Sequence, residues 1–323
     1  MIGIQSIKTY TPGTPVSIHS LPEKEALGDN ELSYFTTCGI DTIYDSGKIG
    51  SYDLAKGACE KLLQEAGIEA SSIDLIIYIQ SRMPEHFISS ESTRLQHDIK
   101  ADNALSFAIS NLGCADSSMA LRLAKDFLAS NRKANNVLIC YGNKLFSNFR
   151  FRNPVTIMGD GGIAALITKT GGHTITDIQI QTNGHYWDLF KLEYRDRSVD
   201  QYKEVCSDIR KYGFELALES RNRFREMNDS ILHDHSLSRQ DISHFLLQNI
   251  STKAYEYYQS AFDIQISPIC AMNLAQYGHL GAGDIFLNYQ TGMEAGIFQK
   301  GEKVMIMNNS PVAAWSSILI NIL

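Results

Sequence analysis

The chain has 323 residues, of which 44% are hydrophobic and 20% charged, and its formal net charge is −7. These values are typical of a folded protein with a large core or two fused domains, and they argue against disorder. The negative charge argues against nucleic-acid binding. No apolar run is long enough to span a bilayer, and the first residues lack the pattern of a signal peptide. We therefore expect a cytoplasmic protein that binds neither nucleic acid nor membrane.

Segments typical of strands and helices alternate along the first half of the chain. Apolar residues recur at helical spacing over 51–67 and 114–130, and continuous apolar runs predict buried strands over 71–81, 103–110, 135–142 and 162–169. Apolar strands separated by helices predict an α/β fold whose sheet is covered on both faces.

The second half repeats this order. A helix is predicted over 212–229 and strands over 241–251, 302–310 and 313–322, and two of these strands match earlier ones at an offset of about 170 residues. We expect two duplicated halves, an N-terminal half over 1–170 and a C-terminal half over 171–323. The same offset places Cys114 and His279 at the N-terminal ends of equivalent helices.

The cysteines lie at Cys38, Cys59, Cys114, Cys140, Cys206 and Cys270, without any C-x-x-C pair. This scatter argues against a zinc site and a disulfide framework, so we expect reduced thiols and no metal. Cys114 differs from the others because it follows a strand and a glycine and begins a helix. The dipole and free N–H groups of such an end favour an anion, so a thiolate there can form a thioester. The alternative is a small buried hydrophobic residue, the role predicted for Cys59, Cys140, Cys206 and Cys270.

Several segments resemble those of one enzyme family. "NLGCADSSMAL" (111–121), "MGDGGIAALI" (158–167), "CGIDTIYDSG" (38–47) and "AAWSSILI" (313–320) resemble, in this order, segments of β-ketoacyl-ACP synthase III enzymes of the thiolase superfamily. The resemblance covers nearly the whole chain. It implies the five-layer αβαβα thiolase fold and an acyl group that passes from CoA or an acyl carrier protein to a cysteine. It implies a substrate thioester rather than a resident cofactor.

The chain departs from the condensing members of this family at two positions. Their catalytic His aligns with Gln248 and their catalytic Asn with His279. Glutamine cannot exchange a proton near neutral pH, so the departure argues against ordinary decarboxylative condensation.

A second branch of the superfamily, acyltransferases of polyketide pathways with a G-H-x-x-x-x-D motif, is more similar here. "GHLGAGD" (278–284) carries that motif, and the resemblance implies a triad of Cys114, His279 and Asp284. On a regular helix the two motif residues would point about 140° apart. They meet only if His279 precedes the helix and Gly278 and Gly281 permit an irregular entry. Otherwise Asp284 is a first-turn acid favoured by the helix dipole.

The resemblance also suggests substrate-binding residues. The family's second oxyanion-hole donor aligns near Pro311, which has no N–H, so we expect Val312 to supply this donor instead. We expect Gln248 to lie in the same substrate and oxyanion region. Arg152 matches an arginine that contacts the adenine end of CoA, although it could instead be a solvated surface residue. Lys253 matches a basic residue that docks acyl carrier protein. Ser33 and Thr37 replace two further CoA-binding residues, which favours a carrier-protein donor.

Three functions are compatible with this sequence. We expect an acyltransferase of secondary metabolism that takes an acyl group from a carrier protein or CoA onto Cys114. The alternatives are a condensing ketosynthase III and a non-catalytic partner subunit of a ketosynthase heterodimer. We expect a homodimer, with the heterodimer as the alternative.

Overall fold

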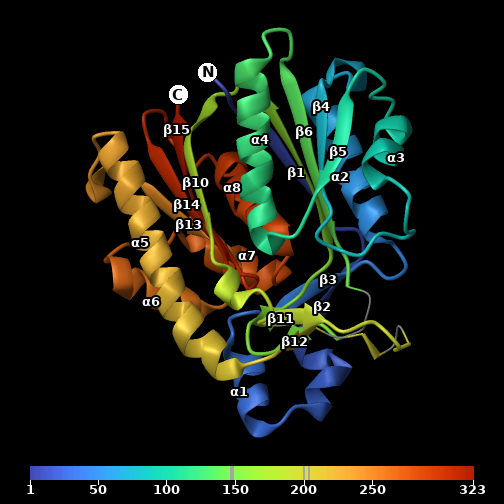
Figure 1. Cartoon of the computed structure of the whole chain (residues 1–323), viewed down its shortest axis with the longest axis vertical. Helices are drawn as coiled ribbons and strands as arrows, with labels where there is room; N and C mark the ends of the chain where they lie inside the picture. The colour runs from blue at the N-terminus through green and yellow to red at the C-terminus, as the bar shows by residue number, and fades with distance from the viewer. Residues whose placement is uncertain (146–148, 199–200, 203) are drawn as a thin grey trace.

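The computed structural model describes residues 1–145, 149–198, 201–202 and 204–323 (Figure 1). A nine-stranded sheet, in the order β13-β14-β15-β10-β1-β9-β6-β4-β5, runs through the molecule. Most predicted segments are confirmed, although the observed strands are generally shorter than the predicted ones.

The first half of the chain contributes one side of this sheet. β4 is parallel to β5 and β6, whereas β9 is antiparallel to β6 and β1. The elements of this half are β1 (Gly3–Tyr10), α2 (Ser51–Ala66), β4 (Leu75–Ile79), α3 (Glu91–Asp98), β5 (Leu105–Ile109), α4 (Asp116–Ser130), β6 (Asn136–Asn143) and β9 (Gly161–Thr168).

The second half repeats this topology. β13 is parallel to β14, and β15 is antiparallel to β14 and β10. Phe245 on β13 forms an isolated parallel bridge with Ile266, on the side where β5 pairs with β4 in the first half. The elements are β10 (His173–Thr182), α5 (Ala217–Asp234), β13 (His244–Leu247), α6 (Thr252–Phe262), α7 (Pro268–Tyr277), α8 (Asp284–Glu294), β14 (Lys303–Ser310) and β15 (Ala314–Ile322). The predicted duplication is confirmed in the strand order, and a boundary between residues 170 and 171 stays a prediction.

The helices form three layers, which enclose the two halves of the sheet, one contributed by each half of the chain (Figure 1). α2 and α3 cover one outer face and α5 covers the other. α4 lies between the two sides, in contact with β4, β6, β9 and β10, and α8 lies beside β1, β9 and β13. Both central helices therefore face sheet on two sides, and every residue of α8 from 284 to 290 is buried. This is the expected five-layer αβαβα arrangement.

Glycines let the outer helix α2 approach the sheet closely. A Cβ atom on Gly142 would lie 1.8 Å from the carbonyl oxygen of Ser51, and one on Gly162 equally close to that of Leu54. Any side chain at either position would force α2 away from β6 and β9, so the small residues fix this packing.

Short elements cap one end of the layers, at the bottom of Figure 1. They are β2 (Thr14–Ser17), α1 (Asp29–Thr37), β3 (Thr42–Asp45), β7 (Phe151–Arg152), β8 (Thr156–Ile157), β11 (Phe190–Leu192) and β12 (Glu204–Cys206). The N-terminal end of α4 faces this cap, which places the start of that helix beneath a cover of short strands. Among the described residues, no helix has the length and apolar character needed to cross a bilayer.

Candidate active site

Cys114 lies in a tight turn that leads into α4. The turn spans Gly113–Ala115, and the thiol-bearing residue is only 5% exposed. Asn308, on β14, donates from Nδ2 to the carbonyl oxygen of Cys114 at 2.9 Å and to Oγ of Ser117 at 3.1 Å. The C-terminal half of the chain therefore holds the cysteine turn of the N-terminal half in place.

His279 occupies the link between α7 and α8. Its N–H donates to the carbonyl oxygen of Ile157 at 2.9 Å, and its own carbonyl accepts from Gly159 at 3.1 Å. These bonds tie the link to the segment before β9. Nε2 of His279 then lies 3.5 Å from Sγ of Cys114, so the imidazole and the thiol are in direct contact.

Asp284 is the first residue of α8 and contacts the other ring nitrogen of His279. Its Oδ2 lies 2.5 Å from Nδ1 and also accepts from the N–H of Asn249 at 2.8 Å. Its Oδ1 accepts from the N–H of Leu280 at 2.7 Å. A carboxylate with both oxygens engaged is held in one orientation, as an imidazole-orienting group requires.

The backbone between these two residues explains how they meet. Gly278 and Gly281 have φ values of 63° and 62°, in the left-handed region, and a 3-10 turn over Gly281–Gly283 precedes α8. His279 thus precedes the regular helix, which is the geometric condition that the five-residue spacing imposes.

The electrostatic setting of His279 favours its protonated form. Burial lowers the pKa of His279, but the charges of Asp284 and Cys114 and hydrogen bonds to both outweigh burial and raise it to about 9. The Cys114 contribution requires a charged sulfur, so it disappears when an acyl group occupies the thiol. The ring can therefore act as an acid beside the free thiol, and its neutral form, which acts as the base, is favoured beside the thioester.

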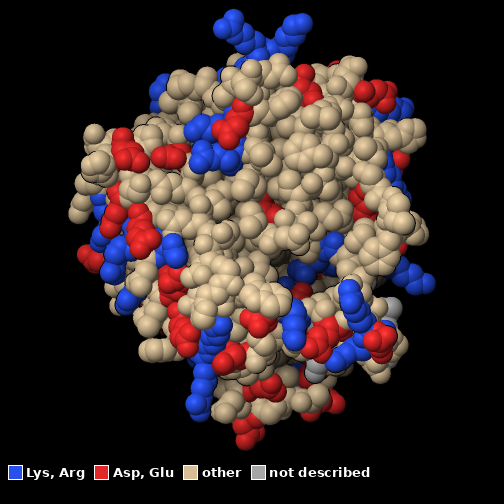
Figure 2. All heavy atoms as spheres, viewed as in Figure 1, with Lys and Arg blue, Asp and Glu red and all other residues tan. Residues whose placement is uncertain are grey.

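A cavity of about 790 Å³ opens in front of Cys114. Its walls come from the ends of β4 and β6, the turn after β14 and the cap strands β7, β11 and β12. In Figure 2 the surface is hollowed near the centre of the face shown, and Lys or Arg atoms are visible inside the hollow. This volume is in the range that binds small organic ligands.

Of three other predicted site residues, one lines this cavity and two do not. Val312 lines it, and its N–H donates to Oγ of Ser310 at a long 3.3 Å. Gln248 is buried, does not line the cavity, and accepts from the N–H of Asn309 at 2.7 Å. Lys253 is exposed near the start of α6 and also lies outside the cavity wall.

Arg152 is a buried part of the cavity wall. Only 8% of its side chain is exposed, and its Nε pairs with Oε2 of Glu204. The alternative of a solvated surface arginine is therefore wrong, because β12 covers this side chain. The contact with the adenine end of CoA stays a prediction.

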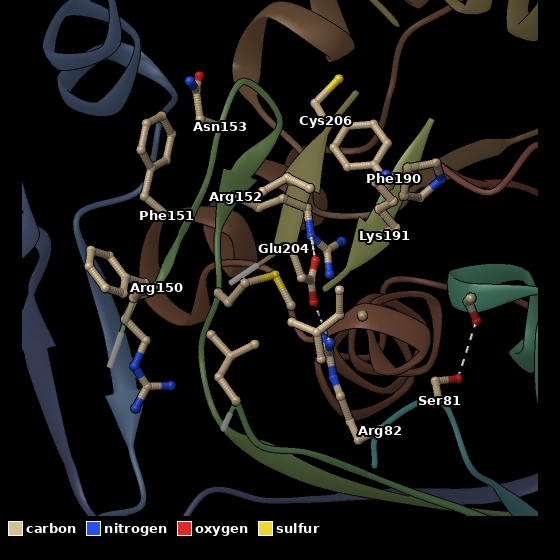
Figure 3. A pocket seen from close by; sticks show the side chains of 18 of the residues that line it. Ser81, Arg82, Arg150, Phe151, Arg152, Asn153, Phe190, Lys191, Glu204 and Cys206 are labelled. Carbon is tan, nitrogen blue, oxygen red and sulfur yellow. Dashed lines mark hydrogen bonds and ion pairs between the residues drawn. The ribbon is translucent and has the colours of Figure 1, made fainter. Parts of the chain in front are cut away.

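Glu204 joins two arginines inside the cavity (Figure 3). Nη1 of Arg82 donates to Oε1 of Glu204 at 2.9 Å, while Arg152 pairs with the other oxygen. Burial raises the pKa of Glu204, but the charges of Arg152 and Arg82 outweigh burial and lower it to about 2. The carboxylate is therefore ionised throughout the physiological range.

The sequence did not indicate Arg82, Glu204 or Asn308 as site residues. Arg82 directly follows a predicted strand and Asn308 lies near the end of another, and these positions were their only signals. Nothing in the sequence indicated Glu204. Cys206 was predicted to be buried, which is wrong, because it is half-buried and lines the cavity. Among the described residues, no group of three or more His, Cys, Asp or Glu side chains could hold a metal ion.

The chain matches known proteins over its full length. The family models "3-oxoacyl-[acyl-carrier-protein] synthase III" and its C-terminal counterpart match residues 109–184 and 232–322. The β-ketoacyl-[acyl-carrier-protein] synthase III of Clostridium tetani is 25% identical, covering 99% of this chain and 98% of the relative. That of Lactococcus lactis is 22% identical, with 97% of each chain covered.

Solved structures show the same fold. ChlB3, described as an acyltransferase, superposes with a TM-score of 0.84 at 16% identity, over 100% of this chain and 98% of the other. The 3-oxoacyl-[acyl-carrier-protein] synthase III of Aquifex aeolicus gives 0.82 at 19%, over 99% and 100%. AbyA1, a tetronic acid condensing enzyme, gives 0.80 at 16%, also over 99% and 100%.

These findings define the class first. A thiolase fold with a cysteine at the entrance of its central helix identifies an enzyme of the thiolase superfamily that transfers or condenses acyl groups. More narrowly, the two models together match more than half of the chain, and it belongs to the 3-oxoacyl-[acyl-carrier-protein] synthase III family.

Proposed function

We propose that the protein is an acyltransferase of secondary, polyketide-type metabolism. Cys114 takes an acyl group from the thioester of an acyl carrier protein or CoA and passes it to an acceptor nucleophile. The observation that carries this proposal is the continuous contact from Sγ of Cys114 through His279 to Asp284.

The first half-reaction forms an acyl-enzyme. Sγ of Cys114 attacks the thioester carbonyl, the carbon–sulfur bond to the donor breaks, and the departing thiolate takes the proton held by His279. The N–H groups of Cys114 and Val312 stabilise the oxyanion, because the bond from Val312 to Ser310 is long enough for a stronger acceptor to replace it.

The second half-reaction releases the acyl group. Nε2 of the now neutral His279 takes the proton of an alcohol, amine or thiol, which attacks the acyl carbon while Sγ of Cys114 departs. Asp284 stabilises the imidazolium formed in this step and fixes the ring so that Nε2 faces the sulfur.

A condensing reaction is the second candidate, because the family model supports it. Gln248 argues against it: the residue offers no base, and its side-chain oxygen is occupied by the N–H of Asn309. Isotopically labelled malonyl thioester separates the two reactions. We expect the label to be transferred intact, whereas release of labelled CO₂ with formation of a β-ketoacyl product would support condensation.

A non-catalytic subunit is the third candidate, since Gln248 replaces a catalytic residue and the turn after β14 lacks glycine. The retained contacts of Cys114 and His279 argue for activity instead. The direct test follows isolated acetyl-Cys114 protein after addition of small alcohols, amines and thiols. Loss of the acetyl mass with formation of the acetylated acceptor supports transfer, and an acetyl group that no acceptor removes faster than water contradicts it.

We also propose that two copies associate through β5, the edge strand of the sheet. Leu105 on this strand is 59% exposed, and an uncovered apolar edge is suited to pairing with another strand. Leu105→Lys should therefore convert a dimer to a monomer in light-scattering measurements. A wild-type monomer that pairs only with a homologous synthase would support the heterodimer.

Finally, we propose a carrier-protein donor that docks against Lys253, because carrier proteins are acidic and this side chain is exposed. Lys253→Glu should raise KM for an acyl carrier thioester several-fold without changing that for the corresponding CoA thioester. An equal change for both donors would contradict carrier docking at this residue.

A further inference from the structure

The cavity in front of Cys114 contains a charged cluster that acyl transfer itself does not require. Arg82 lies in the segment after β4, Arg152 on β7 and Glu204 on β12, and all three line the cavity together with Cys114. Figure 3 shows Glu204 between the two guanidinium groups. Neutral acyl chains would bind equally well to an apolar wall, and the predicted CoA contact concerns Arg152, so the charge of Arg82 needs a separate explanation.

The protein satisfies the Arg82 guanidinium only in part. Its Nε donates to Oδ1 of Asn143 at 2.8 Å and its Nη1 to Oε1 of Glu204 at 2.9 Å. A further side-chain hydrogen bond joins the guanidinium to Tyr141, so three of its five N–H donors have partners within the described ranges of the chain, although the side chain is only 12% exposed. Since Glu204 also pairs with Arg152, one carboxylate serves two guanidinium groups and one positive charge is left over.

Other cations of the cavity wall are engaged elsewhere. Arg150 and Lys144 both bind Asp160, and Lys191 binds Glu193. Arg82 lines the same cavity as Cys114, and although burial lowers the pKa of its guanidinium, the charges of Tyr141, Glu204 and Cys114 outweigh burial and raise it. The surplus positive charge is therefore near the reacting sulfur.

We propose that Arg82 binds a carboxylate carried by the substrate and selects for it beside Cys114. The carboxylate belongs either to the acyl group, as in a dicarboxylic acyl thioester, or to the acceptor, as in a hydroxy acid. A guanidinium with free N–H donors in a shielded cavity binds a carboxylate through charge-assisted hydrogen bonds, and it discriminates against the uncharged amide. The proposal rests on the proposed function in that Cys114 is the acylated residue.

The acyl-group source is tested with a matched pair of thioesters, malonyl and its amide malonamyl. The rate of acylation of Cys114 is measured by mass, with any decarboxylated product counted as malonyl-derived. We expect malonyl to be preferred by about 10- to 100-fold, the range of hydrogen bonds to charged groups, and Arg82→Gln to abolish the preference. Arg82→Lys should restore part of it.

The acceptor source is tested on acetyl-Cys114 protein with a hydroxy acid and its amide. A preference for the acid that Arg82→Gln removes assigns the carboxylate to the acceptor. The matched control is Arg132→Gln, which removes the same charge from an exposed residue at the opposite end of α4 from Cys114. It should leave the preferences unchanged.

A binding measurement keeps this inference separate from the acyl-transfer proposal. Calorimetry with Cys114→Ala protein compares malonate with malonamide and requires no reaction. Tighter binding of malonate that Arg82→Gln abolishes supports the inference even if no thioester acylates Cys114. Equal binding of malonate and malonamide, together with equal rates for acid and amide in both kinetic assays, overturns it.

Glu204 provides a variant with the opposite expectation. Glu204→Gln removes a competing carboxylate, so the preference for anionic substrates should persist or rise. If Glu204→Gln and Arg82→Gln slow malonyl and malonamyl transfer to the same extent, the cluster only holds β12 to the body of the protein, and the inference is wrong.

Discussion

Replacement of Asp284 by asparagine removes the charge that holds His279. The carboxylate accepts from Nδ1 of the ring at 2.5 Å, and its Coulombic effect is the largest that raises the pKa of His279. Without it, only the contact with Cys114 still opposes burial, so the pKa should fall from about 9. Each pKa unit lost removes about 1.4 kcal/mol of stabilisation from the imidazolium.

The kinetic consequence follows from the second half-reaction, in which His279 becomes positively charged. We expect Asp284→Asn to slow acyl transfer by about 10²- to 10⁴-fold, the usual contribution of a positioned base, and to shift the rising limb of the pH–rate profile to lower pH. The assay is single-turnover decay of acetyl-Cys114 in the presence of an amine or alcohol across pH 5–10.

Glu302→Gln is the matched control. Oε2 of Glu302 lies 2.9 Å from Nε2 of His244 at the start of β13, so this substitution removes a carboxylate from another histidine pair. Transfer should be unchanged. A rate for Asp284→Asn within about threefold of the wild type, with the same pH profile, would refute the proposed role of Asp284.

Three further predictions concern stability and geometry. Because the pKa of His279 is raised to about 9, the stabilisation that its protonated ring provides is complete below about pH 6.5 and is lost as the pH rises through 9. The difference in unfolding free energy between the wild type and His279→Gln should therefore decrease by about 3 kcal/mol from pH 6.5 to pH 9. A flat difference would contradict the pKa. Asn308→Ala removes the Nδ2 bond to the Cys114 carbonyl and should lower the unfolding free energy by about 2 kcal/mol in denaturant titrations; no loss would contradict the role of this bond. Gly281 has a φ of +62°, and a Cβ atom there would lie 2.6 Å from Oη of Tyr141, so Gly281→Ala should lose both stability and transfer activity. Gly296 also has a φ of +62° but lies in open space, so Gly296→Ala should lose only stability. Equal transfer activities of the two variants would contradict the tight entry to α8.

Strong periodic patterns predicted the main elements of the fold. The apolar run of β9 is buried at every residue, and α2 carries regularly spaced apolar residues. β10 was not predicted, because its sequence "HTITDIQIQT" contains no continuous apolar run and only two of its ten residues are buried. β11 and β12 are three residues long, too short for a periodic signal.

The candidate site was predicted in part. The motif "GHLGAGD" pointed to His279 and Asp284, but spacing alone could not decide whether they meet, since the answer depends on two left-handed glycines before α8. The cluster of Arg82, Arg152 and Glu204 could not be predicted, because three separate elements bring these residues together only in the folded chain.

The most direct test of the account is the mass of Cys114 after incubation with a panel of acyl carrier protein and CoA thioesters, mapped by peptide. We expect an acyl group on Cys114 of the wild type, slow acylation in His279→Ala and none in Cys114→Ala. Cys206 lines the same cavity without the contact to His279, and it should stay unmodified. An unmodified Cys114 across the whole panel, or acylation of Cys206 instead, would contradict the account.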